Sequence, residues 1–211
     1  MTIETLEATF PWPVIKPSIT PDDHGWMDVR HEKFFINNIP KNVSLIIELG
    51  VWLGKGTKFL TQAFPNAKII SVDHWRGSPE HATMSVNSKL GTLFETFLVN
   101  LWDYKSRIIP VRLDTDNALR LLKNYDLKPD VIYVDAGHDY DSVLSDLLNI
   151  SKIFPDSLIL GDDYKWRDAA GNRPVKQAVA EFCKLTGFTV VLPPVKGLSN
   201  MTCYRIDQKK A

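Results

Sequence analysis

Short apolar runs alternate with longer amphipathic stretches along the chain after Pro40. The apolar runs have the length of buried β-strands, and the stretches between them repeat apolar side chains at helical spacing, as Val143, Leu144 and Leu147 do. The pattern predicts strands at residues 44–49, 68–72, 107–113, 131–135, 157–161, 188–192 and 201–206. It predicts helices at residues 56–64, 92–104, 116–124, 140–153 and 174–186.

The order of these elements predicts the fold class. Strands that alternate with helices form a mostly parallel sheet with helices on both faces. The last two strands are separated only by residues 193–200, which are too few for a helix and suit an antiparallel edge hairpin. We therefore expect an α/β protein with a single Rossmann-like domain over residues 43–211, built on a seven-stranded, mostly parallel sheet with an antiparallel C-terminal edge.

Residues 1–42 have a different pattern and are expected to form an irregular extension that packs on this domain. Several prolines interrupt regular structure there, because proline lacks the N–H donor and restricts the residue before it. A short helix is predicted at residues 25–37, with Trp26 and Phe34 on its apolar face. Trp26 is interpreted as a residue that covers the core, with a substrate-pocket role as the alternative. His31 is interpreted as a surface residue.

Composition excludes several classes of protein. Lys plus Arg equals Asp plus Glu at 25 each, so no net field recruits nucleic acid or an acidic membrane. No apolar stretch reaches transmembrane length, and the N-terminus lacks the pattern of a signal peptide. Cys183 and Cys203 lack zinc-site spacing and are expected to be free thiols. We expect a cytoplasmic protein without nucleic-acid or membrane partners; formation of a homo-oligomer is left open.

Two of the predicted strands end in acidic residues. Asp135 follows one strand, with His138 three residues later, and Asp162 and Asp163 follow the next. One helix-length stretch separates the two strands, which makes them parallel neighbours whose carboxyl ends meet at the ligand-binding edge. Clustered carboxylates repel one another unless a cation lies among them, and Mg²⁺ or another divalent cation prefers such oxygen ligands. The alternatives are that these acids cap a turn or a helix, or that Asp163 faces away while Asp162 binds the metal.

The first predicted strand ends in a glycine-rich turn that contains Glu48, Gly50 and Gly54. Glycines let the chain turn sharply from strand to helix and let backbone amides approach a ligand. A phosphate-binding P-loop is excluded because Gly56 separates Lys55 from the following threonine. The common dinucleotide fingerprint is absent as well, and none of the tyrosines has the lysine four residues later that a short-chain dehydrogenase needs.

The next two strands also end in polar residues. Asp73 ends the second strand, where an acid is suited to bind the two hydroxyls of a ribose. Trp75 follows it in a long loop and is predicted to line the pocket. Asp114 and Thr115 end the third strand, where they either contact an adenine or cap the next helix.

With these residues identified, the chain resembles the class I S-adenosylmethionine-dependent methyltransferases over about residues 43 to 206. The pattern Asp135-x-x-His138 with Asp162-Asp163 resembles the metal-dependent O-methyltransferase branch that modifies macrolide sugars of the macrocin and mycinamicin type and has relatives in the cephalosporin pathway. The resemblance implies magnesium on the three acids and His138 as general base. It implies that S-adenosyl-L-methionine is bound by Glu48, Gly50, Gly54, Asp73, Trp75, Asp114, Thr115 and Asp135.

The function implied is metal-dependent methylation of a hydroxyl on a small molecule, of sugar or natural-product type. The similar plant caffeoyl-coenzyme A and animal catechol enzymes carry Lys near the position of His138 and Asn after the second metal Asp, so His138 and Asp163 favour a sugar-type alcohol. The alternatives are a metal-dependent hydrolase of α/β fold and a non-catalytic S-adenosylmethionine-binding protein. Only the hydrolase would have no use for the glycine turn and the ribose acid.

Overall fold

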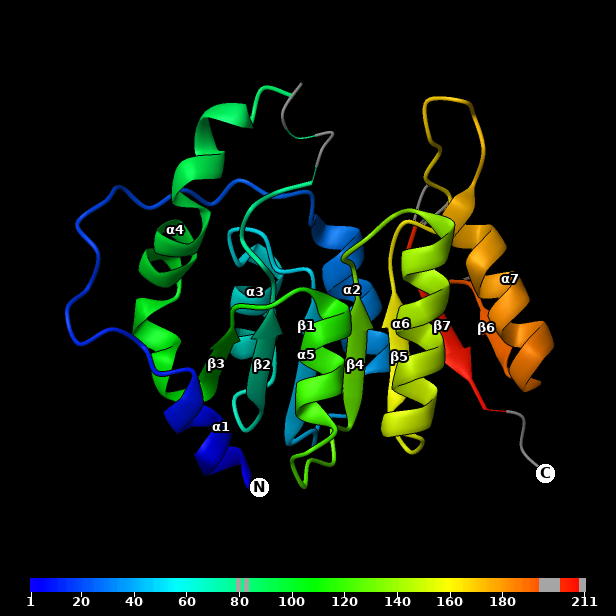
Figure 1. Ribbon diagram of the computed structural model, residues 1–211, viewed down its shortest axis with the longest axis horizontal. Coiled ribbons are helices and arrows are strands. Elements are labelled where there is room, and N and C mark those ends of the chain that lie inside the picture. Colours follow the sequence, from blue (N-terminus) through cyan, green and yellow to red (C-terminus); the bar gives the residue numbers. More distant parts are fainter. Residues whose placement is uncertain (79–80, 82–83, 194–201, 209–211) are drawn as a thin grey trace.

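The central sheet orders the rest of the molecule. The computed structural model describes residues 1–78, 81, 84–193 and 202–208 (Figure 1). Seven strands lie in the order β3-β2-β1-β4-β5-β7-β6. The first five are parallel to one another, and β7 is antiparallel to both β5 and β6. Their bounds are β1 Leu45–Leu49, β2 Lys68–Val72, β3 Ile108–Val111, β4 Val131–Val134, β5 Leu158–Gly161, β6 Thr189–Val191 and β7 Tyr204–Asp207.

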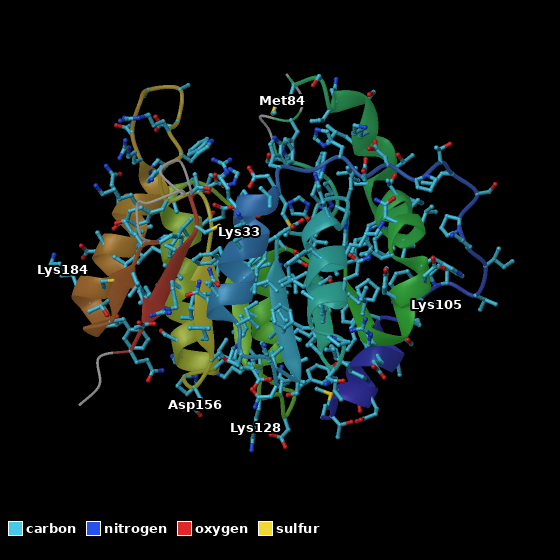
Figure 2. The ribbon with its side chains drawn as sticks, turned by 180° about the vertical axis from the view of Figure 1, so that it is seen from behind. Lys33, Met84, Lys105, Lys128, Asp156 and Lys184 are labelled. Atoms are coloured by element: carbon cyan, nitrogen blue, oxygen red, sulfur yellow. The ribbon has the colours of Figure 1, made fainter. Side chains whose placement is uncertain are left out.

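Helices cover both faces of the sheet. Helices α5, α6 and α7 lie on the face seen in Figure 1, whereas α2 and α3 cover the opposite face seen in Figure 2. Alternate side chains of a strand supply the two cores: Ile47 of β1 packs with the first group of helices and Ile46 with the second. The helices are α1 Ile3–Thr9, α2 Val29–Asn38, α3 Lys55–Ala63, α4 Leu93–Asn100, α5 Thr115–Leu122, α6 Tyr140–Ile153 and α7 Pro174–Thr186, with 3₁₀ turns η2 Asn87–Thr92 and η3 Trp102–Arg107.

The structure confirms the predicted fold class, including the antiparallel edge. Strand β2 and helices α6 and α7 have the bounds that the sequence predicts. Proline begins α7 and Gly187, in the left-handed region, ends it, so local residue chemistry determines both ends. Part of the last predicted strand, at Met201, lies outside the described residues.

The N-terminal 42 residues depart most from expectation. The sequence pattern does not predict helix α1; its only buried residue is Leu6, so its apolar pattern is too sparse to recognise. The predicted helix at residues 25–37 begins later, at Val29. The interpretation of Trp26 as a core-covering residue is wrong, because 54% of its surface is exposed. Phe34 packs in the core as expected.

The carboxyl ends of the five parallel strands lie at one edge of the sheet, the upper edge in Figure 1. The segment that follows β5 rises from this edge, as does the chain directly after β2, at residues 73–78. Among the described residues, no helix is both long and apolar enough to span a membrane.

Candidate active site

The glycine turn after β1 packs directly against the end of β4. Gly50 has φ +86°, and a Cβ atom added to it would lie 2.0 Å from the carbonyl oxygen of Asp135. Gly54 has φ +84°, and a Cβ atom added there would lie 2.6 Å from the Leu101 side chain. Any larger residue at Gly50 would therefore meet backbone atoms as well as backbone strain. This close approach brings the nucleotide-binding half and the acidic half of the predicted site together.

Asp73 holds the glycine turn in place. Its Oδ2 accepts hydrogen bonds from the amides of Val51 at 3.0 Å and Trp52 at 2.9 Å, and its Oδ1 accepts one from the amide of Trp75 at 2.6 Å. The side chain keeps 16% exposure at the sheet edge. Binding of a ribose by Asp73 stays a prediction, and a ribose would share the carboxylate with the turn.

Two of the predicted cofactor-binding residues lie behind the turn. Glu48 is 2% exposed, accepts a hydrogen bond from Thr57, and has its pKa raised to about 8 by burial. Trp75 is 3% exposed, and its Nε1 donates to the carbonyl oxygen of Trp52 at 2.8 Å. In this structure both side chains therefore support the turn from the protein interior.

Asp114 and Thr115 stand at the start of α5. Asp114 is its N-cap and accepts a hydrogen bond from the amide of Asn117 at 2.9 Å, which lowers the pKa of Asp114. Thr115 forms a hydrogen bond with Asp146, a carboxyl buried in α6. The capping role of Asp114 is confirmed. The contact with adenine stays a prediction, and the two roles are compatible.

Asp135, His138 and Asp163 converge at the ends of β4 and β5. Each offers one ligand atom, and the three atoms lie within 4.8 Å of one another. His138 Nε2 is 2.9 Å from Asp163 Oδ2, and the ring of Trp166 lies 5.1 Å from that of His138. Asp163 has φ +60°, a conformation uncommon outside glycine and often found where function requires it.

Asp162 faces a different set of partners. Its Oδ2 is 2.9 Å from His31 Nε2, and its Oδ1 accepts hydrogen bonds from Thr202 and from the amide of Asp163. Burial acts to raise the pKa of Asp162, but the hydrogen bond from His31 and the other donors outweigh it and the pKa is lowered. The two neighbouring acids thus point to different places, and it is Asp163 that joins Asp135.

The acids are also linked through Tyr133. Its hydroxyl donates to Asp135 Oδ2 at 3.2 Å and to Asp162 Oδ2 at 3.4 Å. Burial raises the pKa of Asp135 well above its usual range, and the negative charges of Asp162 and Asp163 raise it further. A divalent cation would relieve the repulsion among these crowded carboxylates, of which Asp162 and Asp163 already contact a histidine each.

Sequence reasoning missed three residues of this site: His31, Tyr133 and Thr202. The interpretation of His31 as a surface residue is wrong, because its side chain is 12% exposed and bonded to Asp162. His31 forms a capping box at the start of α2, where its Nδ1 accepts the amide hydrogen of Asp28. The Asp28-x-x-His31 spacing could have signalled the cap, but Asp162 lies 131 positions later in the chain (162 minus 31), and no local signal predicts that contact.

Comparison with known proteins agrees with this architecture. The model of a family described as a methyltransferase domain matches residues 47–164, more than half of the chain. The chain belongs to this family and is an S-adenosylmethionine-dependent methyltransferase. No curated protein matches the sequence.

Solved structures share the fold at low sequence identity. A protein from Klebsiella pneumoniae, provisionally named an O-methyltransferase, has a TM-score of 0.61 and 17% identity over 90% of this chain and 84% of its own. A Staphylococcus aureus protein, provisionally named a caffeoyl-CoA O-methyltransferase, has a TM-score of 0.60 and 14% identity over 87% and 86%. An O-methyltransferase from Bacillus cereus, solved with S-adenosylhomocysteine (SAH), has a TM-score of 0.55 and 16% identity over 97% and 86%.

Proposed function

We propose that this methyltransferase is a divalent-metal-dependent O-methyltransferase that acts on a hydroxyl group of a small molecule, of sugar or natural-product type. The observation that carries the proposal is the convergence of Asp135, His138 and Asp163 directly beside the glycine turn, where Gly50 touches the backbone of Asp135. The O-methyltransferase names of similar structures agree with it. The balanced charge of the chain favours a small acceptor over nucleic acid.

Residues of the first three strands are proposed to bind the methyl donor. Gly50 and Gly54 would lie against its amino-acid part, Asp73 would accept hydrogen bonds from its ribose, and Asp114 would lie near its adenine. Asp73 also fixes the backbone of the turn, so the loss of its carboxylate would remove a ribose contact and loosen the turn together, and Asp73 and the turn form one binding unit. Glu48 and Trp75 would act by supporting that unit.

The acids of the other half are proposed to hold a divalent cation. Asp135 and Asp163 offer oxygen atoms that converge, and Asp162 would join them from its bonded position beside His31. The donor set fits a hard cation, because it consists of carboxylate oxygens, and burial together with the neighbouring negative charges raises the pKa of Asp135. A cation bound there would lower the pKa of the acceptor hydroxyl and orient it.

His138 is proposed to take the proton from that hydroxyl. Its ring lies beside Asp135 and Asp163, and its Nε2 contacts Asp163. The carboxylate of Asp163 would stabilise the charged imidazolium that forms. The methyl group passes from the sulfonium sulfur of the donor to the acceptor oxygen, and the proton passes to His138. The products are a methyl ether and SAH.

An acceptor screen tests the proposal. Purified enzyme is incubated with S-adenosylmethionine, Mg²⁺ and a panel of glycosides, polyols, catechols and amines, and mass spectrometry records products that gain a methyl group together with SAH. We expect methylation of at least one vicinal hydroxyl compound, lost when EDTA removes the metal and restored by added Mg²⁺. Methylation of amines alone, or hydroxyl methylation that is unchanged in EDTA, would contradict the proposal.

A further inference from the structure

The segment from Asp22 to α2 crosses the carboxyl edge of the sheet and is fixed at both ends. At its first end, the amide of Asp22 donates to Asn100 at 3.0 Å, Asn100 donates back to the Asp22 carbonyl at 2.6 Å, and the Asp22 carboxylate pairs with Lys89. At its second end, Asp28 caps α2 and His31 bonds to Asp162. The segment is therefore attached to the α4 side and to the acids of the site.

Between these anchors, Trp26 stands on the surface within a group of rings. Its ring centroid lies 5.0 Å from His24, 5.4 Å from Trp52, and 5.6 Å from His81, to which it is nearly parallel at 9°. We call these four residues the aromatic cluster. Over half of the Trp26 surface remains exposed, whereas Phe34 and Phe35, a few residues later, are 3% and 1% exposed. Anchoring of the chain thus keeps a large ring out of the core.

Trp52 ties this cluster to the glycine turn. It has φ +54°, a genuine outlier for a bulky side chain, and its backbone is held from two sides. Asp73 accepts its amide hydrogen and Trp75 donates to its carbonyl oxygen. Its indole Nε1 donates to His24 at 3.2 Å. Backbone strain that the surroundings enforce is characteristic of binding sites, and here it places an indole ring between the methyl-donor side and the crossing segment.

We propose that the aromatic cluster binds the ring of the methyl acceptor, with Trp26 as its exposed stacking surface. The inference rests on the proposed function, because the cluster is attached to both halves of the proposed active site. Trp52 belongs to the glycine turn, and the segment that carries Trp26 continues into His31, which contacts Asp162. The acceptor class is a small molecule with a ring that has an apolar face and vicinal hydroxyls. A pyranose and an aromatic diol share this chemistry, since aromatic side chains stack on either.

The contact geometry decides against a purely structural role for Trp26. An indole that supports the fold from the interior buries most of its surface, as Trp75 does at 3% exposure between Phe94 and Phe97. Trp26 contacts rings that are themselves anchored, so it is held in a defined place without being covered. Trp26 is thus an exposed ring fixed over three half-buried rings, an arrangement suited to stacking with a ligand ring.

Saturation-transfer NMR tests the proposal without requiring turnover. Methyl β-D-glucopyranoside and catechol are the two probes, each added to the SAH-saturated protein with Mg²⁺. We expect saturation of the ring protons of at least one probe in the wild type, with apparent affinity reduced roughly 3- to 10-fold in Trp26→Ala. Trp26→Phe should retain most of the signal, because a smaller ring still stacks. If only the glucoside binds, the acceptor is assigned to the sugars; if only catechol binds, it is assigned to the aromatic diols. Binding of both probes assigns it to the ring chemistry that they share.

The matched control is Trp102→Ala, which removes an indole that contacts Trp12 and Lys105 rather than the cluster. It should bind both probes like the wild type. Calorimetry with SAH should give the same affinity for Trp26→Ala as for the wild type, and thermal melting should show that each variant is folded. No saturation of either probe in the wild type, or equal probe affinity in folded Trp26→Ala, would overturn the proposal. Absence of SAH binding to the wild type would instead contradict the methyltransferase function.

Discussion

The two halves of the site are built in different ways. In the β1 to β3 half, the predicted cofactor turn is held by backbone amides and by one carboxylate, Asp73, that follows the next strand. In the β4 to β5 half, the acids are held by side chains: His31 and Thr202, from distant parts of the chain, contact Asp162, and Tyr133 donates to both Asp135 and Asp162. The first half is therefore fixed by local turn geometry, and the second by tertiary contacts.

This difference has a chemical consequence. Backbone amides favour negative charge and form a rigid surface. Such a surface suits a ligand of constant structure, which the methyl donor is. Carboxylates surrounded by side chains can differ in pKa although they are neighbours: the pKa of Asp135 is raised and that of Asp162 lowered. Adjacent acids in this half can therefore have different roles.

The largest effect is expected in the acidic half, from His138→Ala. Loss of a general base typically lowers turnover on the order of 100- to 10,000-fold. Calorimetry with SAH should give an affinity within a few-fold of the wild type, because the glycine turn does not depend on His138. A variant that retains more than about a tenth of wild-type turnover would show that His138 is not the base.

The junction of the two halves is tested by comparing Gly50→Ala with Gly171→Ala. Both glycines have φ +84° to +86°, but a Cβ at Gly50 would lie 2.0 Å from the Asp135 carbonyl oxygen and one at Gly171 would meet nothing within 4 Å. Gly171→Ala should cost about 1–2 kcal/mol of unfolding free energy from backbone strain alone. Gly50→Ala should cost about 1–3 kcal/mol more through the forced backbone shift. Urea unfolding measures both, and equal losses would contradict the close packing of the halves.

The cofactor half is tested by Asp73→Ala. Loss of a charged hydrogen-bond acceptor should weaken SAH binding by roughly 1–3 kcal/mol, through the ribose and through a looser turn. Asp114→Ala offers a comparison, because its carboxylate also caps α5 and lies farther along the predicted ligand. If folded Asp73→Ala binds SAH with wild-type affinity in calorimetry, the assignment of this acid to the donor site is wrong.

The last effect is on stability alone and concerns Asp146, which forms a hydrogen bond with Thr115 from helix α6. Burial raises the pKa of Asp146 from 3.8 to about 7, although the hydrogen bond from Thr115 acts against it. A raised pKa of an acid means that the folded state binds the proton more tightly. Its contribution to stability is therefore full below about pH 4 and is lost as pH rises to about 7.

Asp146→Asn removes this titration. The variant should gain stability relative to the wild type as pH rises from about 4 to about 7, by about 1.4 kcal/mol for each unit by which folding raises the pKa of Asp146. Asp156→Asn is the matched control, because Asp156 is exposed and its charge is not among those that raise the pKa of Asp146. Urea unfolding at several pH values measures the difference. A constant offset between Asp146→Asn and wild type at all pH values would contradict the buried titration.

The two halves also differ in how far the sequence predicts them. Gly50, Asp73 and the order of strands follow from turn chemistry and periodicity, which are local properties. Whether Asp162 or Asp163 points toward Asp135 depends on two features. One is the positive φ at Asp163, and the other is the contact of Asp162 with His31, which lies 131 positions earlier (162 minus 31). The helix pattern misplaces Trp26 for the same reason, since its exposure results from anchors on Asn100 and Asp162 rather than from local periodicity.

Binding of Mn²⁺ to the SAH-saturated protein, followed by the electron paramagnetic resonance signal of the free ion, is the direct test of a metal site at Asp135 and Asp163. We expect about one tightly bound Mn²⁺ per chain in the wild type, displaced by excess Mg²⁺, and loss of that binding in Asp163→Asn. Asp139→Asn, which alters the acid that caps α6 near the site, should bind Mn²⁺ like the wild type. A wild-type protein that binds SAH but no Mn²⁺, or an Asp163→Asn variant that binds Mn²⁺ equally well, would contradict a metal-dependent active site at this edge of the sheet.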